Sequence, residues 1–229
     1  MTPHASAYVF LLGVAAGLTV LTMTAYHRVS PSWLKWLLLA TSLLTLSRYI
    51  AIARFADATY PDQLWSWGYS DYAKSIGFTL PSVMVIDQLL RHPKMSPQRL
   101  LRWIAPLLLT DALMISVVTL APQLDRLLGG WVPHVTSGWR WAFIGVQGLF
   151  VIGFIGAIVF LLRQPYLAQP ARRAFWGLLL AYVALGVDGV SLALGTWSVR
   201  PTLYSDMVAL LAIWYAYDTS ATLSQVPGS

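Results

Sequence analysis

Eight ionisable side chains stand inside long apolar stretches of this chain, and their types and spacing are the first indication of its chemistry. They are Arg48, Asp71, Lys74, Asp87, Asp111, Asp188, Asp206 and Asp218. An ionisable side chain is unfavourable in hydrocarbon, so it usually faces a bundle interior, a charged partner or a water-filled cavity. In such places these residue types form ion pairs, bind ligands or ions, or relay protons. They are therefore the first candidates for a functional site.

Five of these residues are expected in the outer half of the membrane, where they can converge on one polar site: Arg48, Asp71, Lys74, Asp188 and Asp206. Asp71 and Lys74 are three residues apart and share a helical face, so they can pair directly. We expect Arg48 to pair with at least one of Asp71, Asp188 and Asp206, because an unpaired guanidinium at that depth is unfavourable. The group is either a static ion-pair network that fixes helix register or a site for a ligand or ion.

The remaining three aspartates are expected at other depths. Asp111 lies near mid-membrane without a cation at its level, which favours a neutral acid hydrogen-bonded to another helix. Asp87 and Asp218 lie near the cytoplasmic boundary, where they meet Arg91 or water.

Aromatic and other large apolar residues inside the same stretches are candidates for an apolar cavity. They are Tyr49, Phe78, Met114, Tyr182, Trp214 and Tyr217. Packing between helices explains such residues equally well. Both interpretations remain open from the sequence.

The sequence offers little support for metal or catalytic chemistry. All four histidines fall in tails or loops, cysteine is absent, and no serine, histidine or cysteine arrangement has a base at helical spacing. We therefore expect a non-enzymatic protein with no metal site.

The elements that must position these residues are membrane helices. The chain is 57% hydrophobic and only 10% charged, whereas soluble domains carry about 25% charged residues. A spanning helix needs about 20 mostly apolar residues. The sequence predicts an all-α membrane protein, a seven-transmembrane helix bundle in a single domain over 1–229, with spans at 7–26, 33–54, 69–90, 101–121, 139–162, 174–197 and 202–222.

Loop charges predict the orientation of this bundle. Nine lysines and arginines fall in connections on one side and four on the other, which places the N-terminus outside and the C-terminus in the cytoplasm. Met1 to Ala7 lacks the basic residues of a signal peptide, so the first span is expected to be retained. The basic balance indicates contact with anionic lipid rather than nucleic acid. We expect an integral protein of a bacterial inner membrane.

Two further patterns bear on packing. Gly13 and Gly17, the glycines of the fifth span, and Gly186 and Gly189 allow close helix approach, either within the bundle or between copies of the chain. The outer connection from Pro122 to Gly138 can form a small cap over the outer mouth.

Several short motifs resemble those of microbial rhodopsins, which are N-out, seven-helix proteins. In span three, Tyr72-Ala73 is followed by Phe78-Thr79-Leu80-Pro81 and Asp87, and in span four Asp111 precedes Met114 by three residues. In span seven, Asp218-Thr219-Ser220-Ala221-Thr222 is similar to the opsin run Asp-x-Ser-Ala-Lys, whose lysine binds retinal. Here that position is Thr222, so the usual Schiff-base linkage is absent, and Lys74 is the one lysine well inside a span. The layout is also similar to bacterial seven-helix sensor regions.

Three functions follow as expectations. The first is a non-enzymatic, opsin-related receptor or sensor-like protein with an outward-facing pocket for a small apolar ligand, such as retinal, another retinoid or a carotenoid. The second is a protein that translocates protons or ions, because aspartates are distributed across the membrane. The third is an accessory subunit of a larger membrane complex. Expected partners are the lipid bilayer, a second copy of the chain, or a membrane or cytoplasmic signalling protein.

Overall fold

The computed structural model describes most of the chain, and it is almost entirely helical. The described residues are 3–29, 32–57, 64–90, 98, 101–102, 105–106, 109, 120–125, 130–135, 137–194 and 202–224. The helices are α1 Pro3–Tyr26, α2 Ser32–Asp57, α3 Leu64–Leu89, α5 Ser137–Leu162, α6 Gln169–Leu194 and α7 Thr202–Ser224. Two strands, β1 Leu120–Asp125 and β2 Gly130–Val135, pair antiparallel.

Six predicted spans correspond to these helices, with different ends. α3 begins at Leu64 rather than at residue 69, and α6 covers 169–194 rather than 174–197. Pro170 stands in the first turn of α6. A backbone N–H has no intrahelical partner there, so the proline removes no hydrogen bond. The predicted end of the fourth span at residue 121 is wrong, because Leu120 and Ala121 belong to β1. Most of the fourth span lies outside the described residues.

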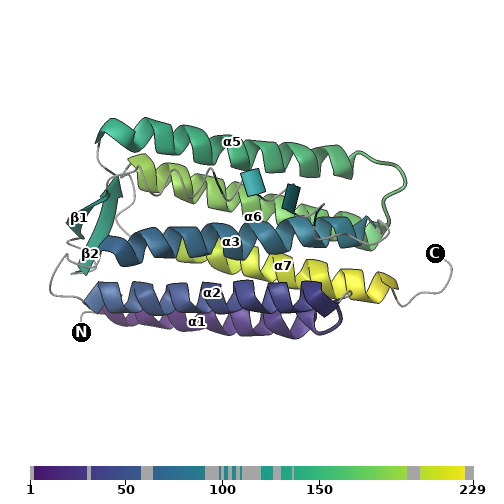
Figure 1. Ribbon diagram of the computed structural model, residues 1–229, viewed down its shortest axis with the longest axis horizontal. Helices are drawn as coiled ribbons and strands as arrows, with labels where there is room; N and C mark the ends of the chain where they lie inside the picture. The colour runs from purple at the N-terminus through teal and green to yellow at the C-terminus, as the bar shows by residue number, and fades with distance from the viewer. Residues whose placement is uncertain are drawn as a thin grey trace.

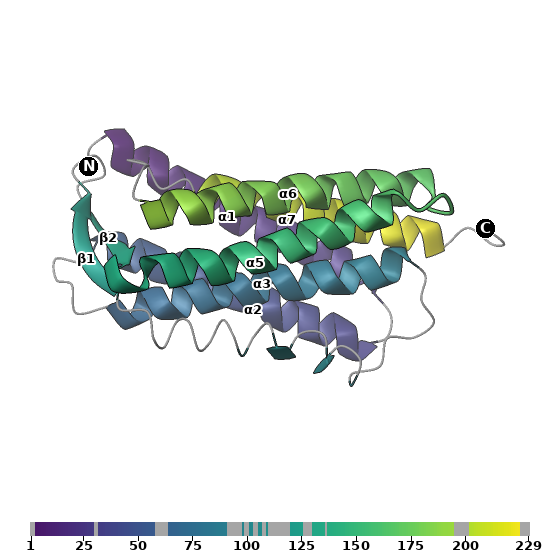
Figure 2. The same ribbon diagram turned by 90° about the horizontal axis from the view of Figure 1, so that it is seen from above.

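The helices form one elongated bundle (Figures 1 and 2). α2 packs against α1 and α3, α6 packs against α5 and α7, and α7 contacts α1, α3 and α6. α7 is therefore the helix that joins the two sides of the bundle.

The two ends of the bundle differ. The hairpin end carries the β1–β2 hairpin and the N-terminus, and the C-terminal end carries the α1–α2 and α5–α6 connections and the C-terminus (Figure 1). The hairpin contacts α2, α3 and α6, which agrees with the cap predicted for this segment.

The outer surface of the bundle is apolar, and some polar groups are buried among the apolar side chains of its core. Large apolar side chains on its outer surface are exposed, including Phe10 at 70%, Leu149 at 72% and Ile152 at 68%. The buried set includes polar and charged side chains: Thr19, Thr22, Thr41, Ser42, Thr45, Arg48, Ser82, Asp188, Ser191, Ser205, Asp206 and Thr219. Soluble monomers rarely expose large contiguous apolar surfaces.

Within the described part of the chain, two helices are long and apolar enough to cross a membrane. The segments are Val9–Tyr26 of α1 and Gln169–Ser191 of α6. Shorter apolar segments occupy Ile76–Leu89 of α3 and Gly148–Leu162 of α5. This property rests on length and composition alone.

Two glycines permit close helix contacts. A Cβ at Gly77 would clash with Thr45 Oγ1 of α2, and a Cβ at Gly186 would lie 2.9 Å from Val151 Cγ1 of α5. The expectation of packing within the bundle is thus confirmed for Gly186. It is wrong for the glycines whose Cβ would meet no atom within 4 Å, because these positions have open space beside them: Gly13, Gly17, Gly145, Gly148, Gly153, Gly156 and Gly189.

Candidate functional site

A buried ion pair joins α2 to α7. Arg48 of α2 donates from Nη1 to Asp206 Oδ2 of α7, and the two side chains are only 2% and 0% exposed. The Tyr49 hydroxyl donates to the same carboxylate oxygen at 3.5 Å. The predicted pairing of Arg48 is confirmed, and its partner is Asp206.

Helix geometry explains how two consecutive residues reach one carboxylate. Successive side chains on a helix point about 100° apart, so Arg48 and Tyr49 approach Asp206 from different sides. The Arg48 guanidinium carbon lies 5.3 Å from the centroid of the Tyr49 ring. The tyrosine therefore interacts with both charged groups.

Asp188 of α6 is a further buried acid toward the hairpin end. Its side chain is 6% exposed, and Ser191 one turn later is 7% exposed. Gly177 of α6 faces Ala212 of α7, and the two helices run antiparallel (Figure 1). This register places Asp188 about 7 Å nearer the hairpin end than Asp206, at about 1.5 Å per residue.

Hydroxyl groups continue from Tyr49 along the α1–α2 interface. The Thr19 side chain lies near the Tyr49 hydroxyl, and the Ser42 side chain lies near the Tyr26 hydroxyl. The Thr22 hydroxyl also lies 3.4 Å from the Leu210 carbonyl of α7, and the Thr45 hydroxyl lies beside Gly77 of α3. The hydroxyls of Thr22 and Thr45 also bond to backbone oxygens of the preceding turn, at 2.8 and 3.0 Å.

The line of hydroxyls ends at a pair of tyrosines near the C-terminal end. Tyr26 of α1 and Tyr217 of α7 meet edge to face, with ring centroids 4.8 Å apart. The Tyr217 hydroxyl donates to the carbonyl oxygen of Pro81 in α3 at 2.9 Å. Pro81 cannot donate a backbone hydrogen bond, so this contact fastens α3 to α7 beside a weakened turn.

The predicted aromatic residues lie in two different settings. Phe78 is buried and its carbonyl accepts a bond of 3.5 Å from Tyr182 of α6, while the Tyr182 ring stacks on Phe154 of α5 at 3.8 Å. This cluster joins α3, α5 and α6. Trp214 is half-buried and packs against the hydrophobic core.

Asp218 lies at the C-terminal end and is half-exposed. Its carboxylate pairs with Arg28 at 3.4 Å, and Arg91, the partner expected from the sequence, lies outside the described residues. Asp87 is also only partly buried. The two acids thus lie apart from the Arg48–Asp206 pair.

Four predicted site residues have no described side chain. Asp71 and Lys74 belong to α3, and their expected pairing concerns side chains outside the described part. Asp111 and Met114 lie wholly outside the described residues. The structure therefore brings together Arg48, Tyr49 and Asp206 from the predicted set.

The position matched to the opsin lysine does not fit a retinal linkage. Thr222 is exposed in the last turns of α7, and its hydroxyl donates to the Asp218 carbonyl at 2.9 Å. A side chain placed there points away from the core. Among the described residues, no three histidines or acids are grouped as metal ligands.

Sequence reasoning missed the hydroxyl line and the tyrosine contacts. The signal was present in the spacing of Thr19 and Thr22 in α1 and of Thr41 and Thr45 in α2, since residues three or four apart share a helix face. Polar residues repeated on one face of an apolar helix indicate an interface with other helices.

Comparison with known proteins gives no relative: no family model matches the chain, and no curated protein matches its sequence.

Proposed function

We propose that this chain is a seven-helix integral membrane protein, opsin-related in layout, that acts as a non-enzymatic receptor or sensor. The N-terminus and the hairpin end face the outside, and the C-terminal end faces the cytoplasm. The buried network of Arg48, Tyr49 and Asp206 is the element that responds to the signal.

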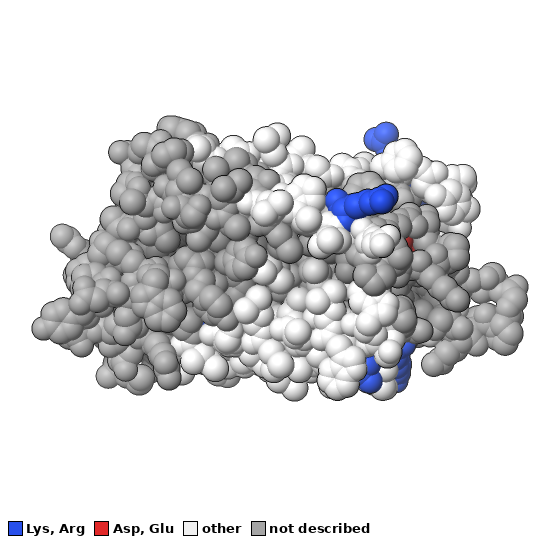
Figure 3. Space-filling view, in the orientation of Figure 1, with Lys and Arg blue, Asp and Glu red and all other residues white. Residues whose placement is uncertain are grey.

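The apolar outer surface of the bundle supports the membrane placement. Apolar side chains cover its outside, whereas its ion pair and hydroxyl groups are inside, as expected where hydrocarbon is the solvent. On the face in Figure 3 the described lysine and arginine atoms lie toward the C-terminal end. Cationic connections favour the cytoplasmic side, which supports the proposed orientation.

The single observation that carries the sensor proposal is the buried Arg48–Asp206 pair. Apolar residues of similar volume often stabilise a protein as well as a buried ion pair does, so stability alone does not explain it. A ligand that competes for either charge would release α2 from α7. Because α7 also contacts α1, α3 and α6, that release would reach most of the bundle.

The aromatic cluster suggests the class of ligand. Gly77 packs on Thr45, which lies one turn from Arg48 toward the C-terminal end. The neighbouring Phe78 and its partner Tyr182 therefore lie on the C-terminal side of the ion pair. A small apolar molecule with one polar end, such as a retinoid or carotenoid held without a covalent bond, matches an aromatic cluster beside a charged pair.

Absorption spectroscopy tests this proposal. The protein in nanodiscs would be titrated with retinal and with a carotenoid, alongside Arg48→Gln and a control, Arg28→Gln, at the C-terminal end. We expect a shifted visible band in the natural protein and the control, and a weaker or absent shift in Arg48→Gln. If each ligand has the same spectrum alone and in the presence of each of the three proteins, the proposal that this protein binds an apolar ligand is rejected.

Orientation is tested separately with single cysteines, since the chain has none of its own. A cysteine in the 91–99 loop should be protected from an impermeant reagent in intact cells, and one in the 123–135 segment should be labelled. The opposite labelling pattern would reverse the topology.

One observation favours a second candidate, a proton pathway. The Tyr49 hydroxyl donates to the Asp206 carboxylate at 3.5 Å, and the buried hydroxyls of Thr19, Thr22 and Ser42 lie in α1 and α2 between this site and Tyr26. Proton flux into vesicles holding the protein, abolished by Asp206→Asn but not by Asp218→Asn, would favour this function over the sensor.

A further inference from the structure

The connection between α5 and α6 is a folded surface rather than a loose loop. Its backbone bonds include Gln164 N to Leu161 O at 3.0 Å and Arg172 N to Ala168 O at 2.9 Å. Leu167 is 8% exposed and belongs to the hydrophobic core. The backbone of this connection is therefore held in place before anything binds.

Three arginines lie on this connection and the start of α6: Arg163, Arg172 and Arg173. Arg163 and Arg173 are exposed, and Arg172 is half-buried with Nη2 donating to the Gln164 carbonyl at 3.3 Å. This hydrogen bond places the Arg172 guanidinium beside Gln164, the residue that follows Arg163.

These guanidinium groups have no acidic neighbour in sequence. The chain holds no acidic residue between Asp125 and Asp188. The ion pairs found among the described residues, Arg28–Asp218 and Arg48–Asp206, do not involve these arginines. The surface is therefore positively charged and ready for an external anion.

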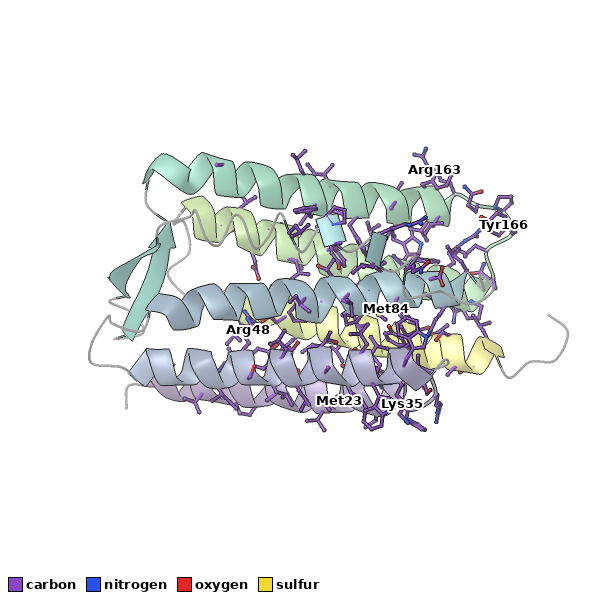
Figure 4. The ribbon with its side chains drawn as sticks, in the orientation of Figure 1. Met23, Lys35, Arg48, Met84, Arg163 and Tyr166 are labelled. Atoms are coloured by element: carbon purple, nitrogen blue, oxygen red, sulfur yellow. The ribbon has the colours of Figure 1, made fainter. Side chains whose placement is uncertain are left out.

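Exposed aromatic rings lie one turn from two of the arginines, on the side toward mid-bundle. Phe160 precedes Arg163 on α5 and is 64% exposed, and Trp176 follows Arg173 on α6 and is 53% exposed. Residues three apart share a helix face, so each arginine extends beyond an apolar ring. Figure 4 shows Arg163 and Tyr166 at this edge of the bundle.

We propose that this surface, formed by Arg163, Arg172 and Arg173 with Phe160 and Trp176, binds the headgroup of an anionic phospholipid. The guanidinium groups contact the phosphate, and the rings contact the acyl chains below it. A soluble phosphate would use the charges but not the rings, which is why the lipid is the favoured ligand. This inference rests on the proposed membrane placement.

The expected strength follows from the charge. A basic residue near an anionic membrane surface contributes about 1 kcal/mol, which is about fivefold in affinity at tenfold per 1.4 kcal/mol. Removal of all three arginines should therefore weaken binding about a hundredfold, and removal of one exposed arginine about fivefold.

Native mass spectrometry of the delipidated full chain in detergent, titrated with phosphatidylglycerol or phosphatidylcholine, tests the proposal. We expect phosphatidylglycerol adducts on the natural protein, about a hundredfold weaker binding in the triple Arg→Gln variant, and retention in the triple Arg→Lys variant. Arg28→Gln is the matched control, because Arg28 lies at the same end but pairs with Asp218. Arg163→Gln and Arg173→Gln alone serve if the triple variant does not fold.

Three results would overturn the proposal. They are equal adducts with the two lipids, unchanged phosphatidylglycerol binding in the triple Arg→Gln variant, and displacement of the lipid by millimolar inorganic phosphate. Flotation of the protein with phosphatidylcholine vesicles tests the membrane placement separately. A protein that floats but shows no preference for phosphatidylglycerol would refute this site and leave the proposed function standing.

Discussion

Replacement of Arg48 by methionine should strongly destabilise the bundle, because Asp206 would remain buried without its cation. The two side chains are 2% and 0% exposed, and removal of one partner of a buried pair costs about 3–5 kcal/mol. At about 2–4 °C per kcal/mol for a chain of this size, the expected fall in Tm is roughly 6–20 °C.

Arg28→Met is the matched control for this change. Arg28 and Asp218 also form an ion pair, at 3.4 Å, but their side chains are 49% and 48% exposed. Exposed pairs contribute about 0–1 kcal/mol. The control should therefore lower Tm by no more than about 4 °C, since the same scaling applies.

A double-variant cycle separates the charge from the packing. Arg48→Met combined with Asp206→Leu removes both charges and leaves apolar side chains, so it should be more stable than Arg48→Met alone. Thermal unfolding in one detergent, followed by circular dichroism, would measure all four proteins. Equal Tm values for Arg48→Met and Arg28→Met would refute the reasoning, as would a double variant no more stable than Arg48→Met.

Two other perturbations test the packing. Gly77→Ala should lower stability by about 1–3 kcal/mol, because the new Cβ would clash with Thr45. Gly13→Ala, which meets open space, should be neutral or slightly stabilising; similar Tm values for the two would contradict the close α2–α3 contact. Tyr217→Phe should cost about 1 kcal/mol, because it removes the hydrogen bond to the Pro81 carbonyl. Unchanged thermal unfolding of this variant would show that the bond contributes nothing.

The sequence predicted the helices well because each is a long apolar stretch bounded by proline, glycine or charged residues. Hydrophobicity over about 20 residues is a local property, so α1, α2, α5 and α7 begin and end within a few residues of the predicted spans. The prediction failed at Leu120 and Ala121, because an apolar run as short as this does not distinguish the end of a helix from a strand. Cross-strand pairing with residues 130–135 decided that segment.

Within the candidate site, the order of residues along the chain was enough to identify the side chains too polar for their surroundings and to predict that Arg48 requires an acidic partner. Several aspartates met that requirement, and only the packing of α2 against α7 selected Asp206. The same packing brought Tyr49 to the carboxylate and separated Asp218, which pairs with Arg28 at the other end. Local composition fixes the cost of burying each group, whereas the choice of partner depends on helix register and rotation, which arise from contacts between residues far apart in the chain.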